Sequence, residues 1–572
     1  MNLINFFKSR PYLLCILTGI LFGISFPPLN IYPAVFIAVA LYIYILTQCE
    51  SYKQVIRRTY ILFFVFELIA VSWIMLSAFN EGADWFIAIG GFFTLIIHPF
   101  LFYVIPSIVL FFFYRTLKKY NHQTLFIFIF PFVWVGFEYF QTLGQINFPW
   151  LFLAYTQTYN LSKIQFIEVT GMFGLSFWIC IIGCLLYKLL FFIYSGRKNT
   201  AKLIILISFI VVIYLLPDCF NFLFINRTSL SNVEQNPIKE EIQVSIIQPN
   251  VNPWKKWGSQ INQITEDYAN QIREAASQEP KPDLIILPET AFPYYLRYDY
   301  YDSHYKIIQN VVDSIDIPVL TGTPDLFVYP DVNSAPPDAR TLNSKGEKYD
   351  VFNSAVLIEP GMHKDSLMVH NKAKLVIASE RMPYQEKLTF LQDMIKWSVG
   401  LSSFQMGQDT TVFSIIVPRE ADTGIIRTFE MDTVYNFNAA ICYESVYPEF
   451  VADYVRKGSE FIVIITNDGW WGKLFGVYQH NQYAVLRAVE NRRWIARCAN
   501  TGISDFISPY GDMFDATEVN VKTIISKKIE ARDFQTIYTM YGDILGRFSM
   551  YSIVVLFLFF MFLRFRHKNS QN

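Results

Sequence analysis

The chain carries little charge for its length. Lys, Arg, Asp and Glu make up 17% of its 572 residues, and the formal net charge is −1. Long basic tracts are absent, so the composition gives no reason to expect a nucleic-acid partner. Cysteine is also scarce: the seven residues are spread along the chain without zinc spacing or a disulfide framework. We therefore expect neither a metal nor a cofactor, while a Cys442–Cys498 bridge stays open for an oxidising compartment.

Apolar residues are abundant instead. They form 53% of the chain, with 17% aromatic residues, which is the composition of a membrane protein. A membrane-spanning helix needs about 20 apolar residues. Eight windows approach that size: Tyr12–Phe26, Ile31–Thr47, Tyr60–Phe79, Trp85–Tyr114, Leu125–Thr142, Phe166–Tyr194, Leu203–Leu216 and Phe548–Leu563. The first is preceded by basic residues but lacks a small-residue cleavage site, so we expect a retained helix and not a signal peptide.

Charge in the connections predicts the topology. If each window crosses once, the basic residues of alternate connections fall on one side, which the positive-inside rule makes cytoplasmic. The window Trp85–Tyr114 is long and contains Pro99 and Pro106, but splitting it in two would spoil this agreement. We predict a membrane domain over 1–220 with seven helices, an outer domain over 225–541, a last membrane helix over 545–564 and a cytoplasmic tail over 565–572. Glu138 and Glu168, near outer window ends, are candidates for function or for a solvated structural role.

The outer domain alternates short apolar runs with amphipathic stretches, which predicts one α/β domain. Expected strands are Gln243–Ile247, Leu284–Leu287, Val319–Thr321, Ser354–Ile358, Asn438–Ile441, Phe461–Ile465 and Ser504–Ile507. Expected helices are Gln260–Ser277, Tyr305–Ile315, Pro448–Lys457 and Gln479–Arg493. The stretch Tyr329–Asp350 is rich in Pro, Asp, Asn and Gly, and we expect a loop or insertion there.

Three polar residues follow or end extended runs in this domain. Glu289 comes after Leu284–Pro288, Lys372 lies in a polar stretch between apolar residues, and Cys442 follows Asn438–Ile441. Strand ends at one edge of an α/β sheet are where catalytic groups usually gather. Taken singly, each residue has a simpler interpretation: a cysteine after an apolar run is usually a small buried hydrophobe, and the two charges are usually solvated.

Together the three residues resemble a known catalytic set. Glu289 in Pro-Glu-Thr, Lys372 eight residues before Glu380, and Cys442 in Cys-Tyr-Glu are similar, in order and spacing, to the Glu-Lys-Cys triad of the nitrilase superfamily. With eight membrane windows around such a domain, the chain resembles the apolipoprotein N-acyltransferase family essentially from end to end. Further agreement comes from Asn147–Trp150, Gln248–Asn250 with Lys256 and Trp257, Thr466–Gly472, and Thr536–Tyr538 before Gly542 and Asp543.

The resemblance implies a fold, a reaction and a place in the cell. The fold would be a polytopic helical membrane domain joined to a nitrilase-like α-β-β-α sandwich. The reaction would move a fatty acyl chain from a phospholipid, through a Cys442 thioester, to the N-terminal amine of a diacylglyceryl-cysteine apolipoprotein. The enzyme would be a multi-pass protein of the bacterial cytoplasmic (inner) membrane, with its catalytic domain on the periplasmic side, and we expect a monomer.

The resemblance also implies residue roles. Glu289 would be the base, and Lys372 would stabilise the oxyanion together with backbone N–H groups. The supporting residues would be Glu380, which orients Lys372, and Tyr443 and Glu444, which flank the nucleophile. Candidate contacts to the acyl chain or headgroup are Trp150, Trp257, Trp470 and Trp471, although aromatic residues in such a domain more often belong to the core.

Two departures from the family pattern concern the site lining. Leu287 stands where the family usually has Trp, and the run Lys374–Glu380 lacks the usual Pro and Gly, which puts the conformation of Ile377–Ser379 in doubt. Two other functions stay open at this point: a membrane-tethered nitrilase-type amidase, and a non-catalytic membrane scaffold or transporter.

Overall fold

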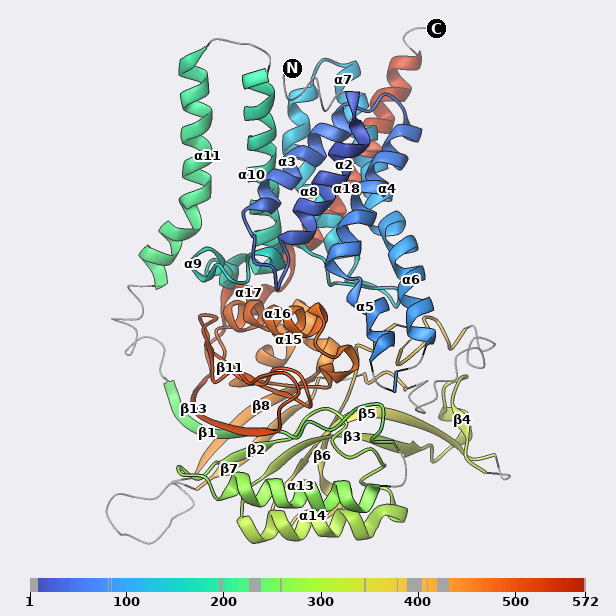
Figure 1. Ribbon diagram of the computed structural model, residues 1–572, viewed down its shortest axis with the longest axis vertical. Coiled ribbons are helices and arrows are strands. Elements are labelled where there is room, and N and C mark those ends of the chain that lie inside the picture. Colours follow the sequence, from blue (N-terminus) through green and yellow to red (C-terminus); the bar gives the residue numbers. More distant parts are fainter. Residues whose placement is uncertain are drawn as a thin grey trace. The chain divides into compact units, whose positions relative to one another are not determined.

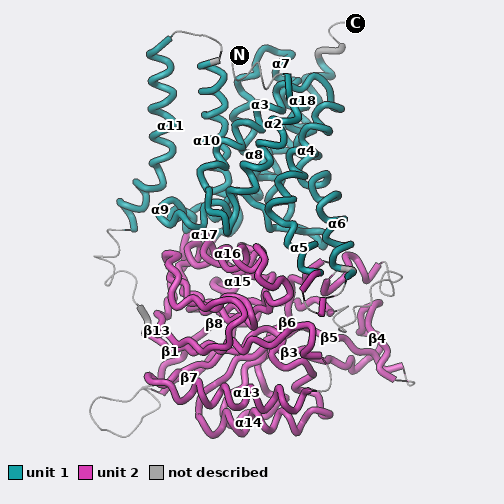
Figure 2. The backbone as a smooth tube through the Cα atoms, viewed as in Figure 1, with its two compact units in different colours: residues 1–78, 85–230, 541–572 teal, residues 79–84, 231–540 magenta. Residues whose placement is uncertain are grey.

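The computed structural model describes residues 9–80, 82–83, 85–194, 199–225, 238–257, 260–343, 346–377, 379–387, 404–408, 410–418 and 432–569. The chain divides into two compact units (Figure 2). Unit 1 comprises residues 1–78, 85–230 and 541–572, and unit 2 comprises residues 79–84 and 231–540.

Unit 1 is helical (Figure 1). Its main helices are α2 (Pro11–Ile24), α3 (Ala34–Thr47), α4 (Tyr52–Ala70), α5 (Trp73–Leu76), α6 (Phe86–Pro99), α7 (Ile105–Lys119), α8 (Phe126–Phe140), α9 (Leu161–Ile164), α10 (Ile167–Tyr194), α11 (Thr200–Phe220) and α18 (Ile544–Asn569). Each of the eight predicted apolar windows coincides with a helix or a helix pair in this set. α6, the π-helical turn Phe100–Val104 and α7 form one helix of 33 residues over Ile87–Lys119, so the fourth window is not split.

Several of these helices have the length and composition to cross a membrane. Among the described residues five do so alone, namely Ile87–Lys119, Gln123–Phe140, Ile167–Ile193, Thr200–Ile225 and Ile544–Arg566, and a sixth would be α4 with Trp73–Phe79, bent by 46°. α2 and α3 have only 14 residues each, about 21 Å at 1.5 Å per residue. The helices thus indicate a membrane protein, while the count of eight crossings stays a prediction.

Small and paired side chains hold unit 1 together. A Cβ on Gly19 of α2 would lie 2.4 Å from the carbonyl oxygen of Leu62 in α4, so only glycine permits this close approach. Two ionisable residues of the apolar windows lie in contact inside the unit. His98 Nδ1 lies 2.7 Å from Glu67 Oε1, and both side chains are buried. Glu138 is buried as well, and accepts hydrogen bonds from Trp134 Nε1 and from the backbone N–H of Leu153. Both hydrogen bonds end on Oε1 and give this buried carboxylate donors within the protein.

Unit 2 contains two stacked β-sheets. The first has the order β13-β1-β2-β3-β5-β4, with β6 also paired to β5; the second has the order β12-β11-β10-β9-β8-β7. The first sheet comprises β1 (Ile238–Gln248), β2 (Leu284–Ile286), β3 (Val319–Val328), β4 (Arg340–Thr341), β5 (Lys348–Ile358), β6 (Met368–Asn371) and β13 (Thr523–Arg532). The second comprises β7 (Val412–Val417), β8 (Thr433–Ile441), β9 (Phe461–Thr466), β10 (Ile495–Ala499), β11 (Asp505–Ile507) and β12 (Met513–Phe514).

Helices cover the outer face of each sheet, which gives the predicted α-β-β-α sandwich (Figure 1). α13 (Ile261–Ala276) and α14 (Asp302–Ile315) pack on the first sheet through one apolar core, and the inner faces of the two sheets share another. α15 (Pro448–Arg456) and α16 (Phe475–Asn491) lie on the second sheet, and the short α17 (Ile537–Tyr541) follows β13. Strands alternate inward and outward residues, so each strand contributes to both cores.

The seven predicted strands and four predicted helices of this domain are all present. The prediction for Tyr329–Asp350 was wrong in part, because Arg340 and Thr341 form β4 and pair with Tyr349 and Lys348 at the start of β5. Polar side chains at this exposed edge conceal the strand from a hydrophobicity pattern. The pattern also missed β6, β7, β10, β12 and β13.

Candidate active site

Glu289 is placed by a strand end and a tight turn. It follows β2 and is buried, and Thr290 after it has a left-handed φ of 48°. A Cβ on Gly322 of β3 would lie 2.5 Å from the Thr290 nitrogen and 2.6 Å from the Glu289 Cα, so the neighbouring strand can approach this turn only with glycine there. Glu289 Oε2 accepts a hydrogen bond of 3.0 Å from the backbone N–H of Asn467, which follows β9.

Lys372 follows β6 and lies between two carboxylates. Its Nζ donates to Glu289 Oε1 at 2.9 Å and to Glu380 Oε1 at 2.8 Å, and the Asn353 amide donates to the same two oxygens at 2.7 and 3.0 Å. Burial opposes the charge on Lys372, but the two carboxylates outweigh burial and hold its pKa well above the ordinary value. Lys372 is therefore a fixed positive charge in the site.

Glu380 ends the loop Lys374–Glu380, which lacks the Pro and Gly that the family usually has there, and its side chain and backbone both bond to Val376. Its Oε2 accepts from the backbone N–H of Val376 at 2.8 Å, and its own N–H donates to the Val376 carbonyl at 2.9 Å. These two bonds bring Glu380 back toward Lys372. Of the doubtful stretch Ile377–Ser379, Ala378 lies outside the described residues.

Cys442 is the first residue after β8. It has a left-handed φ of 50° and is 8% exposed. Burial raises the pKa of its thiol well above the ordinary value; the charge of Glu289 raises it further, and that of Lys372 lowers it. The thiol therefore lies within electrostatic range of both residues and stays protonated until a base takes its proton. Cys442 and Cys498 are both free, so the open possibility of a bridge between them is ruled out.

Glu444 joins the nucleophile to the lysine segment. The carboxylate is fully buried; Oε1 accepts from the Ala373 N–H at 2.6 Å, and Oε2 accepts from the Ile441 N–H at 2.8 Å. His370 Nε2 lies 3.1 Å from the same Oε2. One side chain thus ties the residue before Cys442 to the residue after Lys372. Tyr443 is buried and packs its ring against Tyr447 at 5.3 Å.

The predicted tryptophans fall into two groups. Trp257, Trp470 and Trp471 belong to unit 2 and are half-buried: the Trp471 ring lies 5.8 Å from that of His480, and the Trp470 ring lies 4.7 Å from that of Trp254. The Asn80 side chain donates to the Trp470 carbonyl at 3.0 Å. Trp150 belongs to unit 1, where it is buried and its ring lies 5.6 Å from that of Trp73.

The candidate site draws its residues from both sheets of unit 2. Glu289 and Lys372 follow strands of the first sheet, whereas Cys442 and Asn467 follow strands of the second. The site therefore lies where strand ends of two stacked sheets meet, and not along the edge of one sheet. Sequence alone does not specify which sheet a strand joins, because sheet pairing depends on contacts between distant segments.

Some residues near the site were not assigned a role from the sequence. The buried Lys256 donates from Nζ to the Thr290 carbonyl at 2.8 Å and to the Thr290 hydroxyl at 2.6 Å. Burial lowers the pKa of Lys256 to about 7, and the charge of Glu289 partly opposes this shift.

Asp468 and His480, both buried, lie beside Cys442. Thiol, carboxylate and imidazole are ligand types for zinc. Here the Asp468 oxygens already accept hydrogen bonds from Thr466 and Arg497.

Comparison with known proteins agrees with this geometry. Residues 243–537 match the family model described as carbon-nitrogen hydrolase, and the chain belongs to that family. Residues 18–185 match the model described as the apolipoprotein N-acyltransferase N-terminal domain. The resemblance predicted from the sequence is confirmed.

Relatives match over nearly the whole chain. The apolipoprotein N-acyltransferase of Chlorobaculum tepidum is 28% identical over 94% of this chain and 94% of its own, and that of Geobacter metallireducens is 26% identical over 94% and 92%. A carbon-nitrogen hydrolase structure from Helicobacter pylori aligns with 54% of this chain and 94% of its own, at 14% identity and a TM-score of 0.34.

Proposed function

We propose that this chain is an apolipoprotein N-acyltransferase of the bacterial inner membrane. It would transfer a fatty acyl chain from a phospholipid to the N-terminal amine of a diacylglyceryl-cysteine apolipoprotein, with the catalytic unit on the periplasmic side. The observation that carries the proposal is the contact of Glu289 with Lys372 beside the Cys442 thiol, in a chain that also contains helices suited to a membrane.

In the first half-reaction, Glu289 takes the proton from the Cys442 Sγ as the sulfur attacks the ester carbonyl of the phospholipid. Lys372 and nearby backbone N–H groups stabilise the negative oxygen of the tetrahedral intermediate. The C–O bond then breaks, the lysophospholipid alkoxide takes the proton from Glu289, and the acyl chain remains on Sγ as a thioester.

In the second half-reaction, Glu289 accepts a proton from the acceptor amine as its nitrogen attacks the thioester carbonyl. The C–S bond breaks, the amide forms, and the Cys442 thiolate takes the proton back from Glu289. A thioester keeps enough acyl activation for amide formation without a nucleotide, which suits a site outside the cytoplasm. Hydrolysis competes, so the site must exclude water.

The proposal is tested on the full-length protein in phospholipid vesicles. We expect an acyl adduct on Cys442 that neutral hydroxylamine removes, followed by acyl transfer when a diacylglyceryl-cysteine peptide is added. Cys442→Ala should form no adduct, whereas Cys498→Ala, the matched control for a buried thiol, should still form one.

Two results would overturn the proposal. Release of ammonia from small amides, without a fatty acyl adduct from phospholipid, would identify an amidase. Normal lipoprotein N-acylation in cells that carry only Cys442→Ala would point to a scaffold or to another nucleophile.

A further inference from the structure

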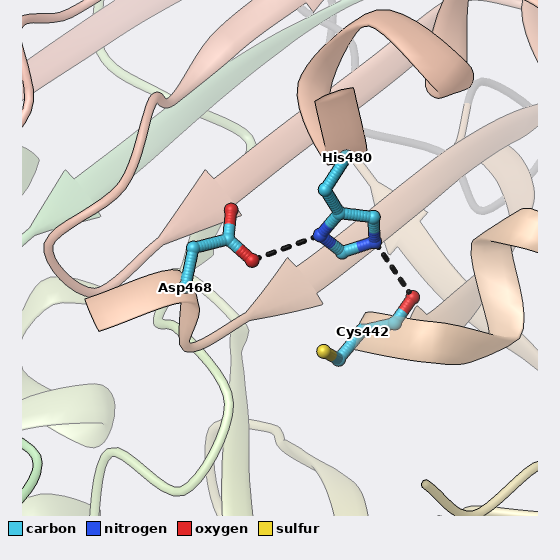
Figure 3. Close-up of side chains that lie close together, drawn as sticks. All are labelled: Cys442, Asp468 and His480. Atoms are coloured by element: carbon cyan, nitrogen blue, oxygen red, sulfur yellow. Dashed lines mark hydrogen bonds and ion pairs between the residues drawn. The ribbon is translucent and has the colours of Figure 1, made fainter. Parts of the chain in front are cut away.

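Asp468 and His480 form a second buried polar cluster beside Cys442, and neither Glu289 nor Lys372 belongs to it. Figure 3 shows Asp468, His480 and Cys442 in a row, with the imidazole between the carboxylate and the backbone carbonyl of Cys442. His480 Nδ1 lies 2.8 Å from Asp468 Oδ1, and Nε2 lies 3.2 Å from the Cys442 oxygen. The Cys442 Sγ, a carboxylate oxygen and a ring nitrogen all lie within 4.8 Å of one another.

The partners of His480 define its protonation. A carboxylate and a backbone carbonyl only accept hydrogen bonds, so a proton on Nδ1 would serve Asp468 and a proton on Nε2 would serve Cys442. Ser445 fits this assignment, because its hydroxyl donates to the Cys442 carbonyl at 2.8 Å and leaves a lone pair for Nε2, 3.0 Å away. An imidazolium is the form of His480 that donates to both of these oxygens.

Charged groups on more than one element face His480, and one of them, Arg497, has the same sign as an imidazolium. Arg497 of β10 donates to Asp468 Oδ2 at 2.6 Å, and its Nη2 lies 3.2 Å from His480 Nδ1. Burial opposes ionisation of Asp468, but Arg497 and His480 outweigh burial and hold its pKa below the usual range. Asp505, also near Arg497, has its pKa raised to about 6 by burial, which Arg497 partly opposes.

The cluster has two effects on the nucleophile. Cys442 has the unfavourable left-handed φ, and its carbonyl is fixed by hydrogen bonds from His480 and Ser445. Asp468 alone would oppose a thiolate at Sγ, since its charge raises the pKa of Cys442. A positive charge on the His480 imidazole would offset the repulsion between the Asp468 carboxylate and a thiolate at Cys442.

We propose that His480 is a positioning residue for the nucleophile: as an imidazolium held by Asp468, it fixes the backbone of Cys442 and supports negative charge on Sγ. The inference rests on the proposed function only in taking Cys442 as the nucleophile. It adds a second positive group to the fixed charge of Lys372, and it gives Asp468 the role of holding the imidazolium.

The test measures alkylation of Cys442 by iodoacetamide against pH in the full-length protein, without any lipid substrate. His480→Gln keeps a donor for the carbonyl but loses the charge; we expect alkylation to be at least about tenfold slower at pH 7, since its midpoint should move up by about one pH unit. At high pH its rate should reach that of the unaltered protein. His480→Ala loses both effects and should stay slower even at high pH. His363→Gln is the control, at a histidine whose side chain is 71% exposed.

The outcomes separate this inference from the proposed function. A His480→Ala protein with the unaltered pH midpoint and limiting rate overturns the inference, even if acyl transfer proceeds. A lower rate with an unchanged midpoint in both variants, together with a lower unfolding temperature, also overturns it, because it indicates a structural role alone. The expected shifts without any acyl adduct would support His480 and reject the acyltransferase.

Discussion

Glu444→Gln tests whether one carboxylate couples the nucleophile to the lysine segment. The substitution keeps the shape but replaces one oxygen with an NH2 group, which cannot accept a hydrogen bond. Whichever way the amide turns, it faces either the Ala373 N–H on one side or the Ile441 N–H and His370 on the other. At least one charge-assisted hydrogen bond is lost, and a buried donor is left unsatisfied.

The magnitude follows from these contacts. A hydrogen bond to a charged group contributes about 1.5–3 kcal/mol, and an unsatisfied buried donor adds to the loss. We take about 2–4 kcal/mol as the total. If this free energy is lost from the catalytic geometry, acylation should slow by about 30- to 1,000-fold, because each 1.36 kcal/mol is a factor of ten in rate.

The assay follows formation of the Cys442 thioester by mass spectrometry in a single turnover, together with the unfolding temperature in detergent. Glu449→Gln is the matched control, because that carboxylate is 43% exposed and pairs with Arg456 at the surface. We expect the control to acylate at the unaltered rate. A Glu444→Gln protein that acylates Cys442 as fast as the control would refute the coupling through this side chain.

Three other substitutions give further expectations. Gly322→Ala should slow acylation at least about tenfold, because its Cβ would displace the turn that carries Glu289, whereas Gly90→Ala, with no atom within 4 Å of its Cβ, should be neutral in the same assay. Lys256 has a pKa of about 7 when folded, against 10.5 ordinarily, so the unfolded chain binds more protons between these values and stability should rise with pH there; the unfolding temperature should rise from pH 7 to 10 relative to Lys256→Met, and parallel curves would contradict the assignment. Glu380→Gln removes one of the two negative charges beside Lys372, and we expect acylation to slow about 10- to 100-fold at pH 7; an unaltered rate would show that this second carboxylate is dispensable.

The membrane helices and the central strands were predictable because their signals are local. About 20 apolar residues in a row predict a membrane helix whatever surrounds them. Runs such as Leu284–Ile286 and Phe461–Ile465 lie in fully buried strands, so their residues are apolar without interruption. β13 escaped prediction because its residues are mostly polar or half-buried and its position is set by pairing with β1, about 280 residues earlier in the chain.

The site was predictable only in part. Glu289, Lys372 and Cys442 could be nominated from their positions at strand ends and from a resemblance, and Glu380 and Glu444 from their short spacing to them. The partners of these residues could not be nominated. Asn353 and Asn467 contact Glu289 from 64 and 178 residues away, and an asparagine in a strand or loop carries no signal of such a contact.

The sequence by itself determined the helical class of one part of the chain, the α/β class of the other, and the order of the three chemical groups. These depend on hydrophobic runs and short spacings, which each segment carries alone. The tertiary structure decided that strand ends from two different sheets meet at one site. It also decided that Glu444 bridges two segments and that His480 lies between Asp468 and Cys442. Such contacts depend on how sheets and helices pack, and packing is fixed only by the whole chain.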